Sequence, residues 1–113
     1  MHFSRMDKHN QTHLGSRQEK FHFTINWFDK NIPIWNKFLE PLKKEKIAVL
    51  EIGAFEGACT TWILEELLLH TDSNLVSIDN FLGSKEHREC PFLSKELDRL
   101  EKRFFYNIKS HNN

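Results

Sequence analysis

A nearly continuous apolar run, Ile47 to Ile52, is the feature that most constrains how this chain folds. A run without polar alternation predicts a parallel strand that is buried on both faces. Beyond a glycine-bearing turn, Ala58 to about His70 shows the spacing of a helix with one apolar face. Leu75 to Ile78 then predicts a second strand that ends at Asp79. Strand, helix and strand together predict one right-handed βαβ unit and therefore an α/β fold.

The residues before this unit divide into an arm and a folded part. Residues 1–20 are mostly polar, so they bury too little apolar surface to offset the entropy of ordering, and we expect a flexible N-terminal arm. His9 and His13 have the spacing of two metal ligands on one helix face. Nothing else in the arm completes a coordination shell, so we expect no metal site. Residues 21–113 are expected to form the folded domain.

Two further helices are expected around the βαβ unit. The first follows Ile32–Pro33 and is kinked or stopped at Pro41. Its apolar face would carry Ile34, Trp35, Phe38, Leu39 and Leu42. The second comes after a polar loop from Gly83 to Pro91, is capped by Ser94, and repeats apolar residues at helical intervals as far as Ile108.

Composition excludes several kinds of partner. The 16 basic residues balance the 16 acidic ones. No net field is therefore available to attract nucleic acid or an anionic membrane surface, and neither is an expected partner. No stretch approaches the roughly 18 apolar residues that cross a bilayer. Cys59 and Cys90 are too few for a disulfide framework or a zinc site. We expect a cytoplasmic protein.

The turn between the first strand and the helix is the strongest candidate for a binding site. Gly53 permits positive φ or leaves room for a ligand, and Gly57 lets the helix start approach a bound group closely. Backbone N–H groups of the turn are expected to face the cleft. Because a helix N-terminus has unsatisfied donors and partial positive charge, this edge suits a carboxylate or a phosphate.

Asp79 supplies a second, independent feature. It lies 22 residues after Gly57, at the carboxyl end of the neighbouring strand. An acidic side chain there can accept hydrogen bonds from both ribose hydroxyls. A glycine-bearing turn alone occurs in many α/β proteins, and an Asp after a strand can simply start a turn. In combination the two features predict a nucleoside or nucleotide site.

The glycine pattern discriminates between nucleotides. Dinucleotide enzymes present G-x-G-x-x-G, in which the second glycine lets the backbone approach the pyrophosphate. In this chain Phe55 occupies that position, where it would obstruct a pyrophosphate but could pack against the smaller charged tail of an amino acid. No G-K-[ST] follows, so ATP hydrolysis is disfavoured.

These residues resemble a known family. Val49 to Gly57 is similar to the first motif of class I S-adenosylmethionine-dependent methyltransferases, especially the small-molecule O-methyltransferase branch with its E-x-G-[AS]-[FY]-x-G-x-[ST] form. Ser77 to Phe81 resembles the second motif. Trp27-Phe28 and Asn31 to Trp35 resemble the helical lead-in of some members, so the similarity runs from about Phe21 to the end. The implied fold is a partial Rossmann-like methyltransferase fold, one βαβ unit plus flanking helices.

The resemblance also implies roles for residues. Glu51 and Gly53 would line the methionine side of the cofactor, Asp79 would hold the ribose, and Phe81 would lie near the adenine. Cys59 stands where the family has Ser or Thr beside the cofactor carboxylate, so that hydrogen bond would weaken or pass to Thr60. The residues expected to bind S-adenosyl-L-methionine are Glu51, Gly53, Ala54, Phe55, Gly57, Cys59, Thr60, Asp79 and Asn80.

Length is the main departure from the family. The family's sheet has about seven strands, and this chain is expected to supply two. The later strands carry the general base and the substrate pocket, so no catalytic residue is named. We expect the N-terminal part of a truncated methyltransferase domain, which either lacks a C-terminal half or joins a larger assembly such as a homo-oligomer.

The favoured function is methyl transfer from S-adenosylmethionine to a small-molecule acceptor. One alternative is a non-catalytic cofactor-binding or interaction module, which has the cofactor-binding turn but catalyses no reaction. Another is an NAD-dependent oxidoreductase, which Phe55 argues against.

Overall fold

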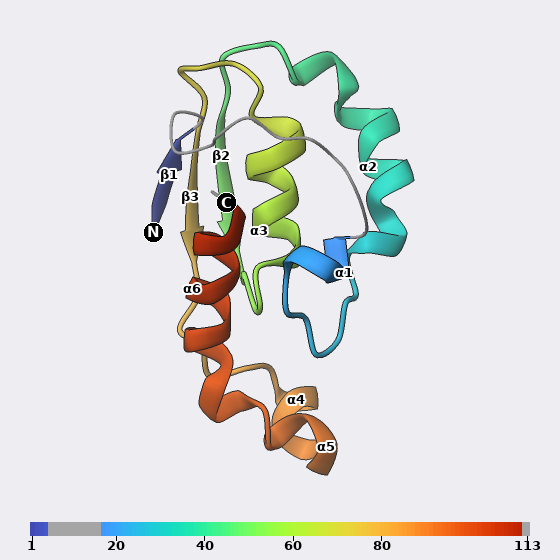
Figure 1. Cartoon of the computed structure of the whole chain (residues 1–113), viewed down its shortest axis with the longest axis vertical. Coiled ribbons are helices and arrows are strands. Elements are labelled where there is room, and N and C mark those ends of the chain that lie inside the picture. Colours follow the sequence, from blue (N-terminus) through green and yellow to red (C-terminus); the bar gives the residue numbers. More distant parts are fainter. Residues whose placement is uncertain (5–16, 112–113) are drawn as a thin grey trace.

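The computed structural model of the chain describes residues 1–4 and 17–111 and shows a small α/β domain with a three-stranded mixed sheet (Figure 1). The strand order is β1-β3-β2. Strands β2 (Ala48–Ile52) and β3 (Asn74–Ile78) are parallel, and β1 (His2–Ser4) pairs antiparallel with β3 on its other side. The central strand of the sheet is therefore β3, and β2 lies at an edge.

The predicted βαβ unit is present. Helix α3 (Ala58–Trp62) continues as one π-helical segment, η4 (Ile63–Leu67), and both lie between β2 and β3 in the chain. The register places Glu51 opposite Ser77 and Ile52 opposite Ile78, so the carboxyl ends of the two strands coincide. The helix ends three residues before the predicted His70.

The N-terminal residues differ from the expected flexible arm at both ends of the segment. His2–Ser4 forms β1, and the Met1 carbonyl accepts a 2.7 Å hydrogen bond from the Ser77 N–H. Arg17–Lys20 forms the short helix α1, in which the Arg17 guanidinium lies 3.0 Å from Asp29. Strand pairing uses backbone groups, so a polar composition does not prevent it. Residues 5–16, with His9 and His13, lie outside the described residues.

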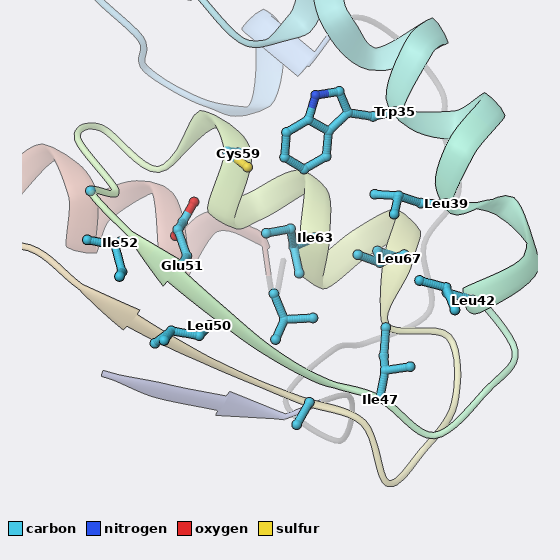
Figure 2. A pocket seen from close by; sticks show the side chains of 13 residues that line it. Trp35, Leu39, Leu42, Ile47, Leu50, Glu51, Ile52, Cys59, Ile63 and Leu67 are labelled. Carbon is cyan, nitrogen blue, oxygen red and sulfur yellow. The ribbon is translucent and has the colours of Figure 1, made fainter.

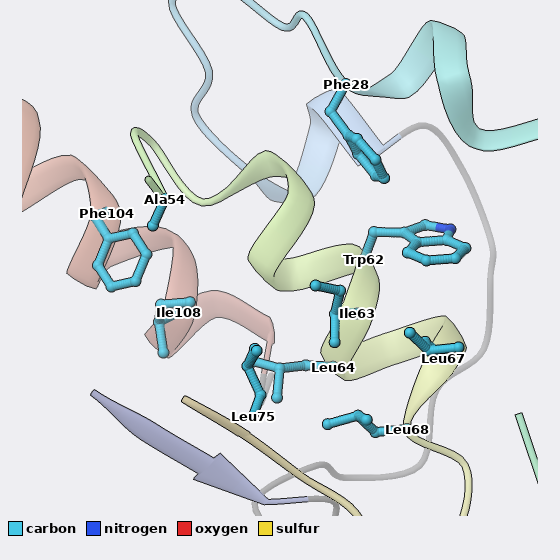
Figure 3. Close-up of a cluster of buried hydrophobic side chains, with 10 residues drawn as sticks. All are labelled: Phe28, Ala54, Trp62, Ile63, Leu64, Leu67, Leu68, Leu75, Phe104 and Ile108. Carbon is cyan, nitrogen blue, oxygen red and sulfur yellow. The ribbon is translucent and has the colours of Figure 1, made fainter. Parts of the chain in front are cut away.

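The hydrophobic core lies on one face of the sheet, against α3, η4 and the C-terminal helix α6 (Leu100–His111) (Figure 3). Leu75 points into it from the central strand, and Phe104 from α6 lies close to Phe3 of β1, with ring centroids 6.5 Å apart. Its buried members are Phe28, Ala54, Trp62, Ile63, Leu64, Leu67, Leu68, Leu75, Phe104 and Ile108.

The opposite face of the sheet carries exposed apolar side chains. Leu50 is 60% exposed, Ile52 is 76% exposed, and Ile78 of β3 is also exposed. The prediction that β2 is buried on both faces is therefore wrong. The run is apolar on both sides, but the described elements cover only the side toward α3 and α6.

Helix α2 (Ile32–Leu39) is present but begins at Ile32, slightly earlier than predicted, because Ile32 already has helical φ and ψ. It is framed by the 3-10 turns η2 (Asp29–Asn31) and η3 (Glu40–Leu42), the second of which contains Pro41. Its predicted apolar face is only partly covered. Trp35 packs edge-on against Trp62 of α3, with ring centroids 5.8 Å apart, whereas Ile34 and Phe38 are exposed.

The segment after β3 is more helical than the sequence predicts. The expected polar loop from Gly83 to Pro91 contains α4 (Lys85–Glu89), and α5 (Pro91–Ser94) follows. Ser94 ends α5 and caps nothing further along, because α6 begins at Leu100 after the 3-10 turn η5 (Leu97–Arg99). None of the helices in the described ranges has the length and apolar character to cross a membrane.

Candidate nucleoside-binding site

The turn after β2 is built from left-handed backbone. Gly53, Phe55 and Gly57 all have positive φ, at 86°, 51° and 88°. Gly57 starts α3, and a Cβ there would lie 3.3 Å from the Phe104 ring, so the glycine allows α6 to pack against the helix start. Gly53 is different, because no atom lies within 4 Å of a Cβ built on it. The space beside Gly53 is open.

Asp79 lies beside this turn, as the spacing predicts, and is bonded to it. Its Oδ2 accepts hydrogen bonds from the N–H groups of Ala54 at 2.7 Å and Phe55 at 2.8 Å. Its Oδ1 accepts one from the Phe81 N–H at 2.7 Å. A carboxylate has about four acceptor sites. Asp79 therefore keeps room for about one ligand hydroxyl, and the expectation that it takes both ribose hydroxyls is not supported by its geometry.

These bonds also correct the expectation that the turn presents free N–H groups. The Ala54 and Phe55 amides already donate to Asp79, so they are not available to a ligand carboxylate or phosphate. The physical reason lies within the chain. Asp79 ends the adjacent parallel strand at the same sheet edge, so its carboxylate reaches the donors that a ligand would otherwise use.

Glu51 is a second carboxylate near the turn, and it is 8% exposed. Its Oε1 accepts hydrogen bonds from the hydroxyls of Thr60 at 2.5 Å and Ser77 at 2.6 Å. Its Oε2 is buried and has no partner among the residues that the structure describes. The Thr60 hydroxyl is therefore occupied by Glu51, which corrects the expectation that Thr60 takes over a bond to the cofactor carboxylate.

An apolar cavity of about 550 Å³ lies between the edge strand β2 and the helices α2, α3 and η4 (Figure 2). Glu51 and Cys59 lie at one end of it and Leu42 and Ile47 at the other, and Gly53 is also part of the lining. Its other lining residues are Trp35, Leu39, Ala48, Val49, Leu50, Ile52, Ile63 and Leu67. We call it the β2-edge cavity. Glu51 is the charged residue in its wall.

Cys59 in this wall is not suited to nucleophilic chemistry. Burial raises the pKa of its thiol far above the ordinary value, and the negative charge of Glu51 raises this pKa further. The nucleophilic form of cysteine is the thiolate. Cys59 therefore stays protonated at neutral pH and acts as a packing residue.

A second cavity, of about 370 Å³, lies at the carboxyl ends of the strands. Asp79 and Gly53 line it on the side of the sheet. The rings of Trp27 and His87 each lie against the Phe55 ring, at centroid distances of 5.4 and 4.6 Å. Its remaining lining residues are Gly83, Ser84 and Leu100. We call it the strand-end cavity. Gly53 lines both cavities.

The structure thus brings together part of the predicted site. Five of its residues line the two cavities: Glu51, Gly53, Phe55, Cys59 and Asp79. Ala54 and Gly57 within the turn and Thr60 in α3 are buried. Asn80 is exposed, and its side chain accepts a hydrogen bond from the Leu82 N–H. Phe81 is half-buried and packs against Phe104 of the core, with ring centroids 5.3 Å apart.

Two residues at the site were not predicted. Glu56 is completely buried, and its carboxylate pairs with Arg103 at 3.1 Å. It also accepts hydrogen bonds from the backbone N–H and the hydroxyl of Thr24, which hold the segment around Thr24 against the turn. No sequence pattern marks this pair, because its members lie 47 residues apart. His87 could have been found, since Ser84 and His87 have the spacing of a helix capping box.

Within residues 1–4 and 17–111, no group of three or more His, Cys, Asp or Glu side chains is placed to hold a metal ion. Comparison of the chain with protein-family models, with curated proteins and with solved structures finds no match.

Proposed function

We propose that this chain binds S-adenosyl-L-methionine and forms the cofactor-binding part of a Rossmann-like methyltransferase that methylates a small-molecule acceptor. The observation that carries the proposal is that two cavities share Gly53 in their walls, with one carboxylate in the wall of each. A ligand with a cationic amino-acid end and a hydroxylated nucleoside end matches this arrangement.

Glu51 fits the amino-acid end. A buried carboxylate oxygen without a partner is costly, because burial has removed its water without supplying a donor. The α-ammonium of the methionine moiety would supply that donor and neutralise the charge. The other described residues that line the β2-edge cavity are uncharged.

Gly53 fits the middle of the ligand. It lines both cavities, and no atom lies within 4 Å of a Cβ built on it, so a ligand can approach its backbone closely. A ligand that spans both cavities must pass this point. Asp79 in the strand-end cavity then has about one acceptor site left for a ribose hydroxyl.

When bound, S-adenosylmethionine supplies an electrophilic methyl group on a sulfonium. The residues of this chain would contribute by holding the two ends of the cofactor, so that the methyl group has a fixed position. The described part of the chain provides no group that we assign as a general base for the acceptor.

The bonds made by Asp79 and Thr60 favour a second candidate, a non-catalytic cofactor-binding module. Both side chains are tied into the fold itself, as expected of a structural turn. The same bonds disfavour an NAD-dependent oxidoreductase. A pyrophosphate would need hydrogen bonds from the turn amides, which already donate to Asp79. In addition, Phe55 stands at the position where a dinucleotide-binding turn has a glycine.

Titration calorimetry of the chain with S-adenosylhomocysteine, S-adenosylmethionine and NAD tests the proposal. We expect the two adenosyl amino acids to bind and NAD not to bind. Binding accompanied by methyl transfer to a panel of phenols and carboxylates supports the enzyme, and binding without transfer supports the module. Preferential binding of NAD, or no binding of either adenosyl ligand, would contradict both.

A further inference from the structure

His87 lies in the strand-end cavity and has no role in the proposal so far. It belongs to α4 and is only 6% exposed. Its ring stacks on Phe55 with an interplanar angle of 17°, and the Trp27 ring lies 4.8 Å from it. Asp79 lines the same cavity. A titratable side chain thus lies against two aromatic rings beside the proposed ribose site.

The hydrogen bonds of His87 fix which ring nitrogen carries its proton. The backbone N–H of Ser84 donates to Nδ1 at 2.9 Å. A backbone N–H can only donate, so Nδ1 acts as an acceptor and is unprotonated. The proton of the neutral imidazole is therefore on Nε2.

This Nε2–H group has no acceptor in the described part of the chain, although it is buried. An unpaired buried donor is destabilising, whereas a ligand atom that accepts from it would remove that cost. The neighbouring rings of Phe55 and Trp27 favour a planar ligand group, because such a group can stack on them. Trp27 is 47% exposed and is therefore the ring of this cluster that can most easily move to admit one.

We propose that the Nε2–H of His87 donates a hydrogen bond to a ring nitrogen of the adenine of a bound adenosyl ligand. The inference rests on the proposed function and assigns a base-binding residue to it. The strand-end cavity then carries an acceptor for a ribose hydroxyl, Asp79, and a donor for the base, His87, beside the aromatic ring of Phe55. Because Nε2 already carries a proton, His87 donates a hydrogen bond to the ligand and does not remove a proton from it.

Two substitutions remove the Nε2–H group in different ways. His87→Glu keeps an acceptor for the Ser84 N–H at the N3 position of the capping box, but it has neither the ring nor an N–H group. His87→Phe keeps a ring against Phe55 but loses the cap. Glu89→Gln is the matched control, since it changes an exposed residue of the same helix that lines neither cavity. Urea unfolding identifies any variant that does not fold.

Calorimetry on the 113-residue chain uses S-adenosylhomocysteine, adenosine and the 1-, 3- and 7-deaza analogues of adenosine. We expect both His87 variants to bind S-adenosylhomocysteine about tenfold more weakly, the loss expected for one hydrogen bond, and Glu89→Gln to bind it nearly normally. One deaza analogue should bind about tenfold more weakly than adenosine to the wild type, and equally well to the His87→Phe variant.

The outcomes separate this inference from the proposed function. Unchanged S-adenosylhomocysteine affinity in both His87 variants overturns the role of His87 and leaves the proposed function standing. Adenosine binding that depends on His87, without any binding of S-adenosylhomocysteine, supports the role of His87 and overturns the proposed function. Binding of neither ligand by the folded wild type overturns both.

Discussion

The Oδ2 atom of Asp79 accepts a 2.8 Å hydrogen bond from the backbone N–H of Phe55, and this contact ties the end of β3 to the turn after β2. Phe55 requires a stabilising contact of this kind. Its φ of 51° lies in the left-handed region, which a bulky residue rarely adopts without support from its surroundings. Asp79 is thus part of the turn's structure, whether or not a ligand is present.

Replacing Asp79 with Ala should therefore destabilise the free protein. Three backbone N–H groups would lose a charged acceptor, and we expect the free energy of unfolding to fall by about 2 to 3 kcal/mol, because a hydrogen bond to a charged group contributes about 1.5 to 3 kcal/mol and the three share one partly exposed side chain. Urea unfolding measures this. Asp72→Ala, at an exposed loop position, is the control. Equal stability of the two variants would show that Asp79 does not hold the turn.

Glu51→Gln should weaken only ligands that carry an amino group. The amide keeps an acceptor for the hydroxyls of Thr60 and Ser77 but removes the charge that an ammonium would pair with. We expect a loss of about 1.5 to 3 kcal/mol for S-adenosylhomocysteine, the range for a charged hydrogen bond. The affinity for 5′-methylthioadenosine, which lacks the amino acid, should not change. Calorimetry compares the two ligands, and Glu89→Gln on the exposed surface of α4 is the control.

A parallel loss for both ligands would place the amino group elsewhere. Glu51 would then affect binding through the fold of the turn, by way of Thr60 and Ser77, and not through direct contact.

Two leucines on neighbouring strands should respond very differently to the same substitution. Leu75→Ala opens a cavity beneath α3 and α6, and we expect it to lower the free energy of unfolding by about 2 to 5 kcal/mol. Leu50→Ala changes a side chain on the uncovered face of the sheet and should cost less than about 1 kcal/mol. Urea denaturation of both variants at low protein concentration checks this. A cost at Leu50 similar to that at Leu75 would mean that the exposed face is covered in solution.

These elements also show what the sequence can and cannot predict. The βαβ unit was predictable because each of its segments has its own local pattern, apolar run or helical spacing. Strand β1 was not, because its residues are ordered by the free edge of a strand more than 70 positions away. The exposure of Leu50 was missed for a related reason. An apolar run indicates which residues suit burial, but coverage depends on where other elements pack.

The site shows the same division. The adjacency of Asp79 and the turn followed from parallel strands that end at one sheet edge. The hydrogen bonds from the turn amides to Asp79 could not be predicted in the same way, because these donors and this acceptor can pair with each other instead of with a ligand. The pairing of Glu56 with Arg103 depends on how α6 packs over the turn, which no local pattern encodes.

Cys59 should resist alkylation well above neutral pH. Its pKa is raised by burial and by Glu51, so its reactive thiolate is scarce where an ordinary thiol, with a pKa near 9.0, is partly ionised. In a Cys90→Ser background, the rate of reaction with iodoacetamide at pH 8 to 9 should be far below that of a cysteine peptide, and should match it after unfolding in urea. Rapid reaction in the folded state would show that Cys59 is accessible and ionised.

The buried pair of Glu56 and Arg103 should be among the most sensitive contacts in the protein. Arg103→Met leaves the Glu56 carboxylate buried without its cation, and we expect unfolding to become easier by about 3 to 5 kcal/mol. Adding Glu56→Gln should recover part of this loss, because the amide carries no charge and still accepts hydrogen bonds from Thr24. Lys102→Met, on the exposed side of α6, controls for the loss of a positive charge. A double variant less stable than Arg103→Met alone would show that the Thr24 contacts, not the ion pair, are what require a carboxylate at Glu56.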